Sequence, residues 1–162
     1  MKRQKAWLWI LAIVIGVIVI AGFAASRASI SALDPPGQFE TALATRAKHE
    51  LVARAAGRMR LLPPPYSDAD AKSGKVLFSI ECASCHGNGR EPSRIGQAMY
   101  PRVPDLGSRE VQKWSDAELF WIIQHGIRLS GMPGFKNMDT DPQIWNLVQY
   151  IRTLPKSAAV AQ

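Results

Sequence analysis

The pentapeptide Cys82-Ala83-Ser84-Cys85-His86 constrains this chain more than any other feature. Cys-x-x-Cys-His is the attachment sequence for c-type haem. Its two thiols, three positions apart, reach the two vinyl groups of one porphyrin. The histidine that follows is then carried under the iron as an axial ligand. The sequence therefore predicts one haem c, bound covalently through Cys82 and Cys85 and coordinated by His86.

Two other uses of a cysteine pair fit this sequence less well. A thioredoxin-like redox pair expects a βαβ setting and needs no histidine, and the residues around Cys82 do not alternate as a strand would. A structural zinc site needs four ligands. The chain has two cysteines and three histidines, without a second Cys or His pair. Both uses are therefore disfavoured relative to haem attachment.

An uncharged apolar run of 20 residues, 6–25, lies near the N-terminus. As a helix it would be about 30 Å long, which matches the hydrocarbon core of a bilayer. Lys2, Arg3 and Lys5 precede the run, whereas only Arg27 follows it closely. The positive-inside rule then places the N-terminus in the cytoplasm and the chain from residue 28 in the periplasm.

A cleaved signal peptide is the competing interpretation of this run. The apolar region of a signal peptide usually has about 7–15 residues, so the longer run favours an uncleaved anchor. Both interpretations export the rest of the chain. We expect a single-pass protein of the inner (plasma) membrane, with its haem domain facing the periplasm.

The distribution of charge argues against nucleic-acid binding. The net charge of the chain is +7, but residues 67–162 carry 11 basic and 10 acidic side chains. The basic excess belongs to the N-terminal part, so the C-terminal domain offers no basic surface to a phosphate backbone. The nucleotide-binding patterns GxGxxG and GxxxxGK[ST] are also absent from the sequence.

The segment between anchor and domain is expected to contain a helix over residues 38–60, with one apolar stripe. The stripe consists of Phe39, Leu43, Ala47, Leu51, Ala55 and Met59. Two interpretations are open: the helix packs on the domain or along the membrane surface, or it docks a partner subunit. We expect His49, on this helix, to be exposed to solvent rather than a ligand.

A short polyproline spacer, residues 63–65, follows this helix. Such a spacer is extended and semi-rigid, and we expect it to hold the next domain off the preceding helix. The domain boundary is placed at Tyr66–Ser67. The predicted divisions are an N-terminus and anchor (1–27), a linker (28–66), a haem domain (67–156) and a tail (157–162).

The iron of an electron carrier needs a second axial ligand, and methionine opposite histidine raises the potential. The candidates are Met99, Met132, Met138 and His125. Met132 is favoured because flanking Gly and Pro residues fix a loop and leave its side chain free of a helix. His125, followed by a glycine, is expected to end a helix instead.

From about Asp68 to Leu154 the sequence resembles a class I cytochrome c domain. The resemblance implies an all-α fold around one haem. It also implies that Gly74 and Phe78 of a first helix meet Tyr150 of the last helix. Helices are expected near residues 68–82 and after Ser115, which forms a capping box with Glu118. The last helix is expected to begin with Asp141 as its N-cap and Pro142 at its first position.

The same resemblance assigns roles around the haem. Residues 131–135 resemble the Met-Pro ligand loop of the family, with Met132 as the second axial ligand. Pro104 resembles the proline whose carbonyl accepts a hydrogen bond from the proximal histidine. The family pattern does not assign residues 90–102. Three candidates to bind haem propionates, with core packing or a solvated surface as the alternative, are Tyr100, Arg102 and Trp114.

These observations predict a membrane-tethered monohaem c-type cytochrome that transfers single electrons between redox partners, and not an enzyme. No group of side chains typical of substrate chemistry is recognisable. The partners are the membrane and unnamed donor and acceptor proteins. One alternative is a fixed cytochrome subunit of a larger respiratory or photosynthetic complex. Another is a haem enzyme or gas sensor, which would need an open distal site.

Overall fold

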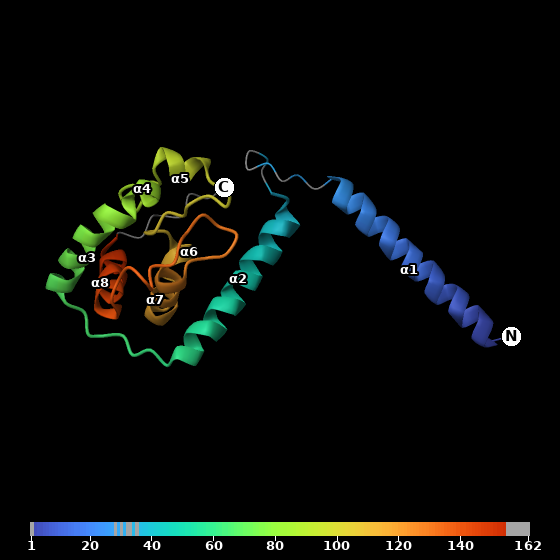
Figure 1. The fold of residues 1–162 in the computed structure, drawn as a ribbon, viewed down its shortest axis with the longest axis horizontal. Helices are drawn as coiled ribbons and strands as arrows, with labels where there is room; N and C mark the ends of the chain where they lie inside the picture. Colours follow the sequence, from blue (N-terminus) through green and yellow to red (C-terminus); the bar gives the residue numbers. More distant parts are fainter. Residues whose placement is uncertain (1, 28, 30, 32–33, 35, 155–162) are drawn as a thin grey trace. The chain divides into compact units, whose positions relative to one another are not determined.

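The computed structural model describes residues 2–27, 29, 31, 34 and 36–154. The predicted C-terminal tail, residues 157–162, lies outside the described residues. Every regular element among the described residues is a helix, which confirms the all-α class. The chain divides into two compact units between residues 34 and 35. One unit contains helix α1, and the other contains α2 to α8 (Figure 1).

Helix α1 (Lys2–Arg27) forms over the predicted anchor. Its section Trp7–Arg27, 21 residues long, is long and apolar enough to cross a membrane. None of the side chains in this section is buried against the protein, as expected for a helix whose surroundings are lipid. A signal sequence near the N-terminus has the same length and apolar character.

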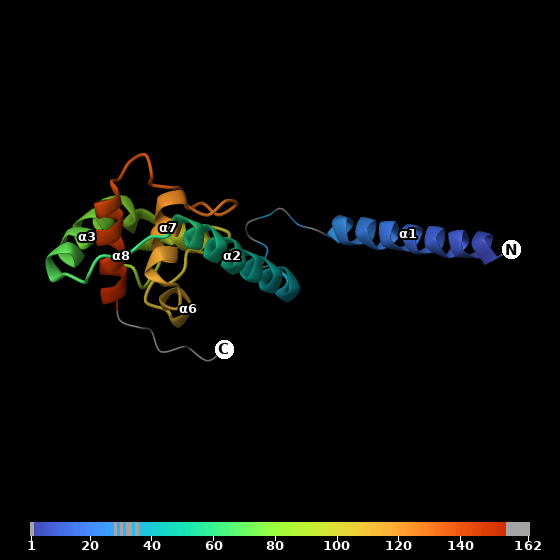
Figure 2. The ribbon, with the colours of Figure 1, turned by 90° about the horizontal axis from the view of Figure 1, so that it is seen from below.

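The second unit is built on the crossing of α3 (Asp68–Glu81) and α8 (Asp141–Thr153) (Figures 1 and 2). Gly74 makes the close approach possible, because a Cβ there would lie 1.9 Å from the carbonyl oxygen of Asn146. One turn later the rings of Phe78 and Tyr150 meet, with centroids 5.1 Å apart and planes inclined at 55°. The crossing predicted from the resemblance is therefore present.

Helix α7 (Asp116–His125) completes the core between α8 and α2. Its capping box is the predicted one: Ser115 Oγ accepts from the amide of Glu118, and the Glu118 carboxylate accepts from the amide of Ser115. His125 is its last residue, as expected. The largest fully buried side chains of the unit are Phe120, Ile144, Leu147 and Val148.

The start of α8 differs by one residue from the prediction. Thr140, rather than Asp141, is the N-cap, and it forms a capping box with Gln143. Asp141 therefore has a different role. Its carboxylate accepts a hydrogen bond of 2.9 Å from the Nε2 of Gln124, which is buried. This bond ties the first turn of α8 to α7.

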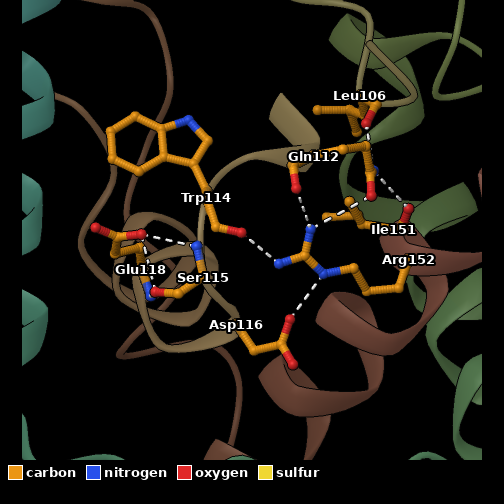
Figure 3. A network of polar contacts seen from close by, with 8 residues as sticks. All are labelled: Leu106, Gln112, Trp114, Ser115, Asp116, Glu118, Ile151 and Arg152. Atoms are coloured by element: carbon orange, nitrogen blue, oxygen red, sulfur yellow. Dashed lines mark hydrogen bonds and ion pairs between the residues drawn. The ribbon is translucent and has the colours of Figure 1, made fainter. Parts of the chain in front are cut away.

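Arg152 joins the other end of α8 to the segment before α7 (Figure 3). Its Nε donates to Asp116 Oδ1 at 2.7 Å, and its terminal nitrogens donate to the carbonyl oxygens of Gln112 and Trp114. Gln112 ends the short helix α6 (Arg109–Gln112), and its Nε2 donates to the carbonyl of Ile151 at 3.1 Å. The network fixes the corner where α6, α7 and α8 meet.

Helix α2 (Gln38–Met59) packs on α7 with a different face from the predicted one. Val52 and Ala56 are buried. By contrast, the side chains of Phe39, Leu43 and Leu51 are 82%, 59% and 64% exposed. The predicted stripe advanced four residues at a time, and such a row winds around a helix of 3.6 residues per turn. Only a row that alternates steps of three and four stays against one neighbour.

The polyproline spacer does not hold the domain off α2, which corrects that expectation. The chain after α2 turns back toward α3 (Figure 1). Gln149, buried in α8, fixes this return: its Oε1 accepts from the amide of Ser67 at 2.8 Å, and its Nε2 donates to the carbonyl of Pro65 at 3.4 Å. Ser67 is also the N-cap of α3. The domain boundary at Tyr66–Ser67 stays a prediction, and α2 shares a compact unit with the helices after it.

Candidate haem-binding site

The Cys-x-x-Cys-His motif lies on helix α4 (Ala83–His86), directly after α3. The carbonyl of Cys82 accepts from the amide of Cys85 at 3.1 Å and from the amide of His86 at 2.8 Å. This single turn brings both thiols and the imidazole onto one short stretch of chain. Gly87 then reverses the chain with φ = 57°, where a Cβ would lie 2.1 Å from the carbonyl oxygen of Glu91. Only glycine fits this position.

The surroundings of His86 disfavour the charged form of its imidazole. Burial lowers the pKa of His86, and the backbone carbonyl of Pro104 opposes this effect and raises it. The Nδ1 atom is buried and has no hydrogen bond of standard geometry among the described residues. Neutral imidazole is the form that coordinates a metal. The surroundings of His86 therefore favour the form of the imidazole that a haem iron would bind.

The thiol of Cys82 is also shielded from water. Burial raises the pKa of Cys82 to about 12, and the neighbouring carboxylates of Glu81 and Asp139 add to this effect. Cys82 packs against the hydrophobic core, and no disulfide joins it to Cys85. Both cysteines are therefore available for thioether bonds.

Pro104 lies on a segment that backbone bonds attach to the motif loop. The amide of Leu106 donates to the carbonyl of Gly89 at 2.8 Å, and the amide of Val103 donates to the carbonyl of Gly96 at 3.3 Å. Gly96 belongs to helix α5 (Arg94–Ala98), within the stretch that the family pattern does not assign. These bonds hold the segment that contains Pro104 beside the chain that follows the motif, and the Pro104 carbonyl acts on His86.

Met132 lies on the loop between α7 and α8, and backbone bonds fix the loop on both sides of it. The carbonyl of Met132 accepts from the amide of Ile127 at 3.3 Å, and the amide of Phe135 donates to the carbonyl of Ile123 at 3.1 Å. Gly126 begins the loop with φ = 69°, and a Cβ there would lie 2.6 Å from the Met132 carbonyl oxygen. The Met132 side chain is half-buried and packs against the core.

Two of the other ligand candidates, His125 and Met138, are exposed, and the third, Met99, is half-buried. His125 is exposed, its Nδ1 lies 3.1 Å from the carbonyl oxygen of Trp121, and its ring stacks on the indole of Trp121. Met138 is 61% exposed. Met99 is half-buried and touches the ligand loop, because a Cβ on Gly131 would lie 1.9 Å from Met99 Cε. Met132 stays the predicted ligand.

A cavity of about 580 Å³ opens beside Met99. It is lined by Arg94, Ile95, Ala98 and Met99, three apolar residues and one cation. The α5 backbone packs tightly on the motif, since a Cβ on Gly96 would lie 2.2 Å from the carbonyl oxygen of Cys85. The pocket itself lies on the exposed side of α5, and its lining residues do not include the Cys-x-x-Cys-His motif.

Comparison with known proteins agrees with this geometry. The sequence profile of the family described as cytochrome c oxidase, cbb3-type, subunit III matches residues 69–151, just over half of the chain. The chain belongs to this family. Its cytochrome c domain is a class I monohaem domain, which implies covalently bound haem c and an electron-carrying role.

A solved structure shares the fold. A chain of the reducing HAO-like protein complex of Kuenenia stuttgartiensis aligns with a TM-score of 0.53 and 20% identity, over 59% of this chain and 48% of that chain. Cytochrome cL of Methylophaga aminisulfidivorans aligns with a TM-score of 0.45 and 27% identity, over 55% of each chain. The cytochrome thus spans about half the length of these two chains. A search of curated proteins gave no match.

Two of the residues that were candidates to bind haem propionates, Trp114 and Tyr100, interact instead with side chains of α2. Trp114 is buried, and its indole stacks on the imidazole of His49. His49 is therefore half-buried in a stacked pair, which corrects the expectation of a solvent-exposed histidine. Burial raises the pKa of Tyr100, and the nearby Glu40 carboxylate raises it further. Arg102 is exposed.

The sequence did not reveal a carboxyl pair at the edge of the site. Glu81 is the last residue of α3, and Asp139 lies in the loop before α8. The two side chains interact, and both act on the thiol of Cys82. They are 58 positions apart in the sequence, so no local pattern could have joined them.

Proposed function

We propose that this protein is a membrane-tethered monohaem c-type cytochrome that transfers single electrons between redox partners on the periplasmic side of the membrane. The observation that carries the proposal is the α4 turn, which follows Cys82 and places Cys85 and His86 on a single helical turn, with the Nδ1 atom of His86 buried. In this proposal Cys82 and Cys85 would hold haem c through thioether bonds, and His86 and Met132 would coordinate its iron. Bound haem c supplies a one-electron Fe(III)/Fe(II) couple.

The residues around the proposed ligands keep their positions fixed. Pro104 orients His86 through its carbonyl, as carbonyl partners of ligating histidines do. Met132 lies on a loop anchored by backbone bonds before and after it. Two ligands on rigid supports leave little geometry to reorganise when one electron arrives or leaves. This property suits electron transfer and disfavours binding of a substrate at the iron.

The proposed tether is α1, with the N-terminus in the cytoplasm. A tether raises the effective concentration of the domain near membrane-bound donors and acceptors. The mass of the mature protein tests this part of the proposal. A mass that includes residues 1–27 supports the anchor, whereas loss of this segment would show that α1 is a cleaved signal.

Binding of carbon monoxide to the reduced full-length protein tests the closed site. We expect no binding at neutral pH, because Met132 occupies the sixth position. The Met132→Ala variant should bind carbon monoxide, and Met138→Ala, which changes an exposed methionine, should behave like the unmodified protein. Ready binding by the unmodified protein would contradict the proposal and favour a haem enzyme or gas sensor.

A fixed subunit of a larger complex is the second candidate function. The observation that favours it is the outer face of α2, where Phe39, Leu43 and Leu51 remain exposed. A partner subunit would cover this face. Purification in mild detergent separates the candidates: a complex that Leu43→Ser plus Leu51→Ser disrupts supports the subunit, and a free monomer supports the shuttle.

A further inference from the structure

The carboxyl groups of Glu81 and Asp139 meet where α3 ends and the chain enters α8. Asp139 is only 8% exposed. One oxygen of each carboxyl group, Glu81 Oε2 and Asp139 Oδ2, is buried and has no hydrogen-bond donor among the described residues. A buried ionised carboxylate without a donor is costly. The two groups therefore need a source of compensation.

No basic side chain supplies that compensation within the described part of the chain. The ion pairs there join Arg54 to Glu50 and Arg152 to Asp116. The charged or titratable groups that act on the pair and its neighbour are Glu81, Asp139, Cys82 and Cys85. The amide of Asp139 is also unavailable, because it donates to the carbonyl of Phe135 at 2.9 Å.

A shared proton satisfies both carboxyl groups at once. Two ionised carboxylates cannot form a hydrogen bond with each other, because neither has a donor hydrogen. A single proton makes one group the donor and the other the acceptor. A proton shared in this way belongs to the pair and not to one residue. Consistent with this, burial raises the pKa of Glu81, and the Asp139 carboxyl raises it further.

We infer that Glu81 and Asp139 form a proton-binding site whose occupancy is coupled to the redox state of the haem. The pair lies directly beside Cys82, one of the two proposed points of haem attachment. Reduction adds one negative charge at the haem, and this charge favours the protonated pair. When a donor protein supplies one electron, the pair takes one proton from water. When the electron passes to an acceptor, the proton returns to solvent.

This inference rests on the proposed function, because it needs a redox-active haem at Cys82. Its test is the midpoint potential of the full-length protein in detergent, measured by spectroelectrochemistry from pH 5 to pH 9. We expect the potential to fall as pH rises through the titration of the pair. The limiting slope is about 59 mV per pH unit, which is a tenfold change in the one-electron equilibrium.

Glu81→Gln and Asp139→Asn keep the size of each side chain and remove the shared titration. Each should abolish the pH-dependent fall in potential. Glu110→Gln, which changes an exposed carboxylate on α6, is the matched control and should keep it. A slope that stays the same in both pair variants would overturn the inference and assign the pH dependence to another group, such as a haem propionate. A potential independent of pH in the unmodified protein would overturn it as well.

Infrared difference spectra between the two redox states give an independent readout. Reduction should produce a band of a protonated carboxyl group, and Glu81→Gln should change or remove this band. Its absence from the unmodified protein would overturn the inference, even if a variant fails to incorporate haem. Failure of the proposed function looks different, because the protein would then lack covalent haem or would bind carbon monoxide.

Discussion

The imidazole of His49 stacks face to face on the indole of Trp114, with centroids 3.9 Å apart and planes inclined at 6°. His49 belongs to α2, which precedes the family match at residues 69–151, whereas Trp114 belongs to the matched domain. With Val52 and Ala56 buried beside it, the stack makes α2 part of the structure that supports the haem domain.

Replacing His49 tests this contribution. We expect His49→Ala to lower the free energy of unfolding by about 1 kcal/mol, since a stacked aromatic pair contributes about 0.5–1.5 kcal/mol beyond its buried area. Denaturant unfolding, followed by haem absorbance, measures the change. His49→Phe keeps a ring over Trp114 and should retain most of the stability. Equal stability of His49→Ala and the unmodified protein would show that the stack contributes nothing.

Two glycines in helices should respond in opposite directions to alanine. Gly74→Ala places a methyl group 1.9 Å from the Asn146 carbonyl oxygen, so α3 and α8 must separate, at a cost of about 3 kcal/mol. Gly57→Ala meets no atom within 4 Å and should stabilise α2 by about 1 kcal/mol. Thermal unfolding of both variants makes the comparison. A harmless Gly74→Ala would contradict the close crossing.

Arg152 should not be replaceable by lysine. Its guanidinium bonds to Asp116 and to the carbonyls of Gln112 and Trp114, and the single ammonium of lysine cannot reach all of them. We expect Arg152→Lys to destabilise the protein by about 2 kcal/mol. Arg54→Lys is the control: its pair with Glu50 is exposed, at 71% and 62%, and should change stability by less than about 0.5 kcal/mol. Similar losses in both variants would be the contrary result.

Glu81 should make the folded protein less stable as the pH rises. Its pKa is raised in the folded protein, first by burial and then by Asp139, so the folded state binds the proton more tightly than the unfolded chain. The stability that this proton adds is fully present at pH values below the pKa of Glu81 in the unfolded chain. It is lost as the pH rises through the pKa of Glu81 in the folded protein. Glu81→Gln should therefore be more stable than the unmodified protein at pH 8, and the difference should vanish near pH 4. A difference that grows toward low pH would contradict this sign.

Much of the haem domain could be predicted because its signals are local. The capping box from Ser115 to Glu118 marked the start of α7. In α8 the buried apolar residues Ile144, Leu147, Val148 and Ile151 follow one another at helical spacing. The meeting of Phe78 with Tyr150 came instead from the family resemblance, since no local pattern connects two helices. Thr140 replaced Asp141 as the N-cap because two adjacent residues offered competent side chains, and Gln143 completed a capping box with Thr140.

Other features depend on packing that one sequence does not reveal. The apolar stripe that contains Phe39 and Leu43 is not the face of α2 that packs on the domain, because the buried residues of α2 are Val52 and Ala56. The short helices α5 and α6 have no periodic pattern of apolar residues. They begin after Ser93 and Ser108, whose hydroxyl groups accept hydrogen bonds from backbone amides of the first turn. The pair of Glu81 with Asp139 exists only through the tertiary fold.

The far-red absorption of the oxidised full-length protein tests the central claim most directly. An iron–methionine sulfur bond gives a weak charge-transfer band in this region. We expect the band in the unmodified protein and in Met99→Leu, and we expect Met132→Ala to remove it while covalent haem remains attached. A haem-containing protein without the band, or a band that survives Met132→Ala, would contradict axial ligation by Met132 and the closed electron-carrier site built on it.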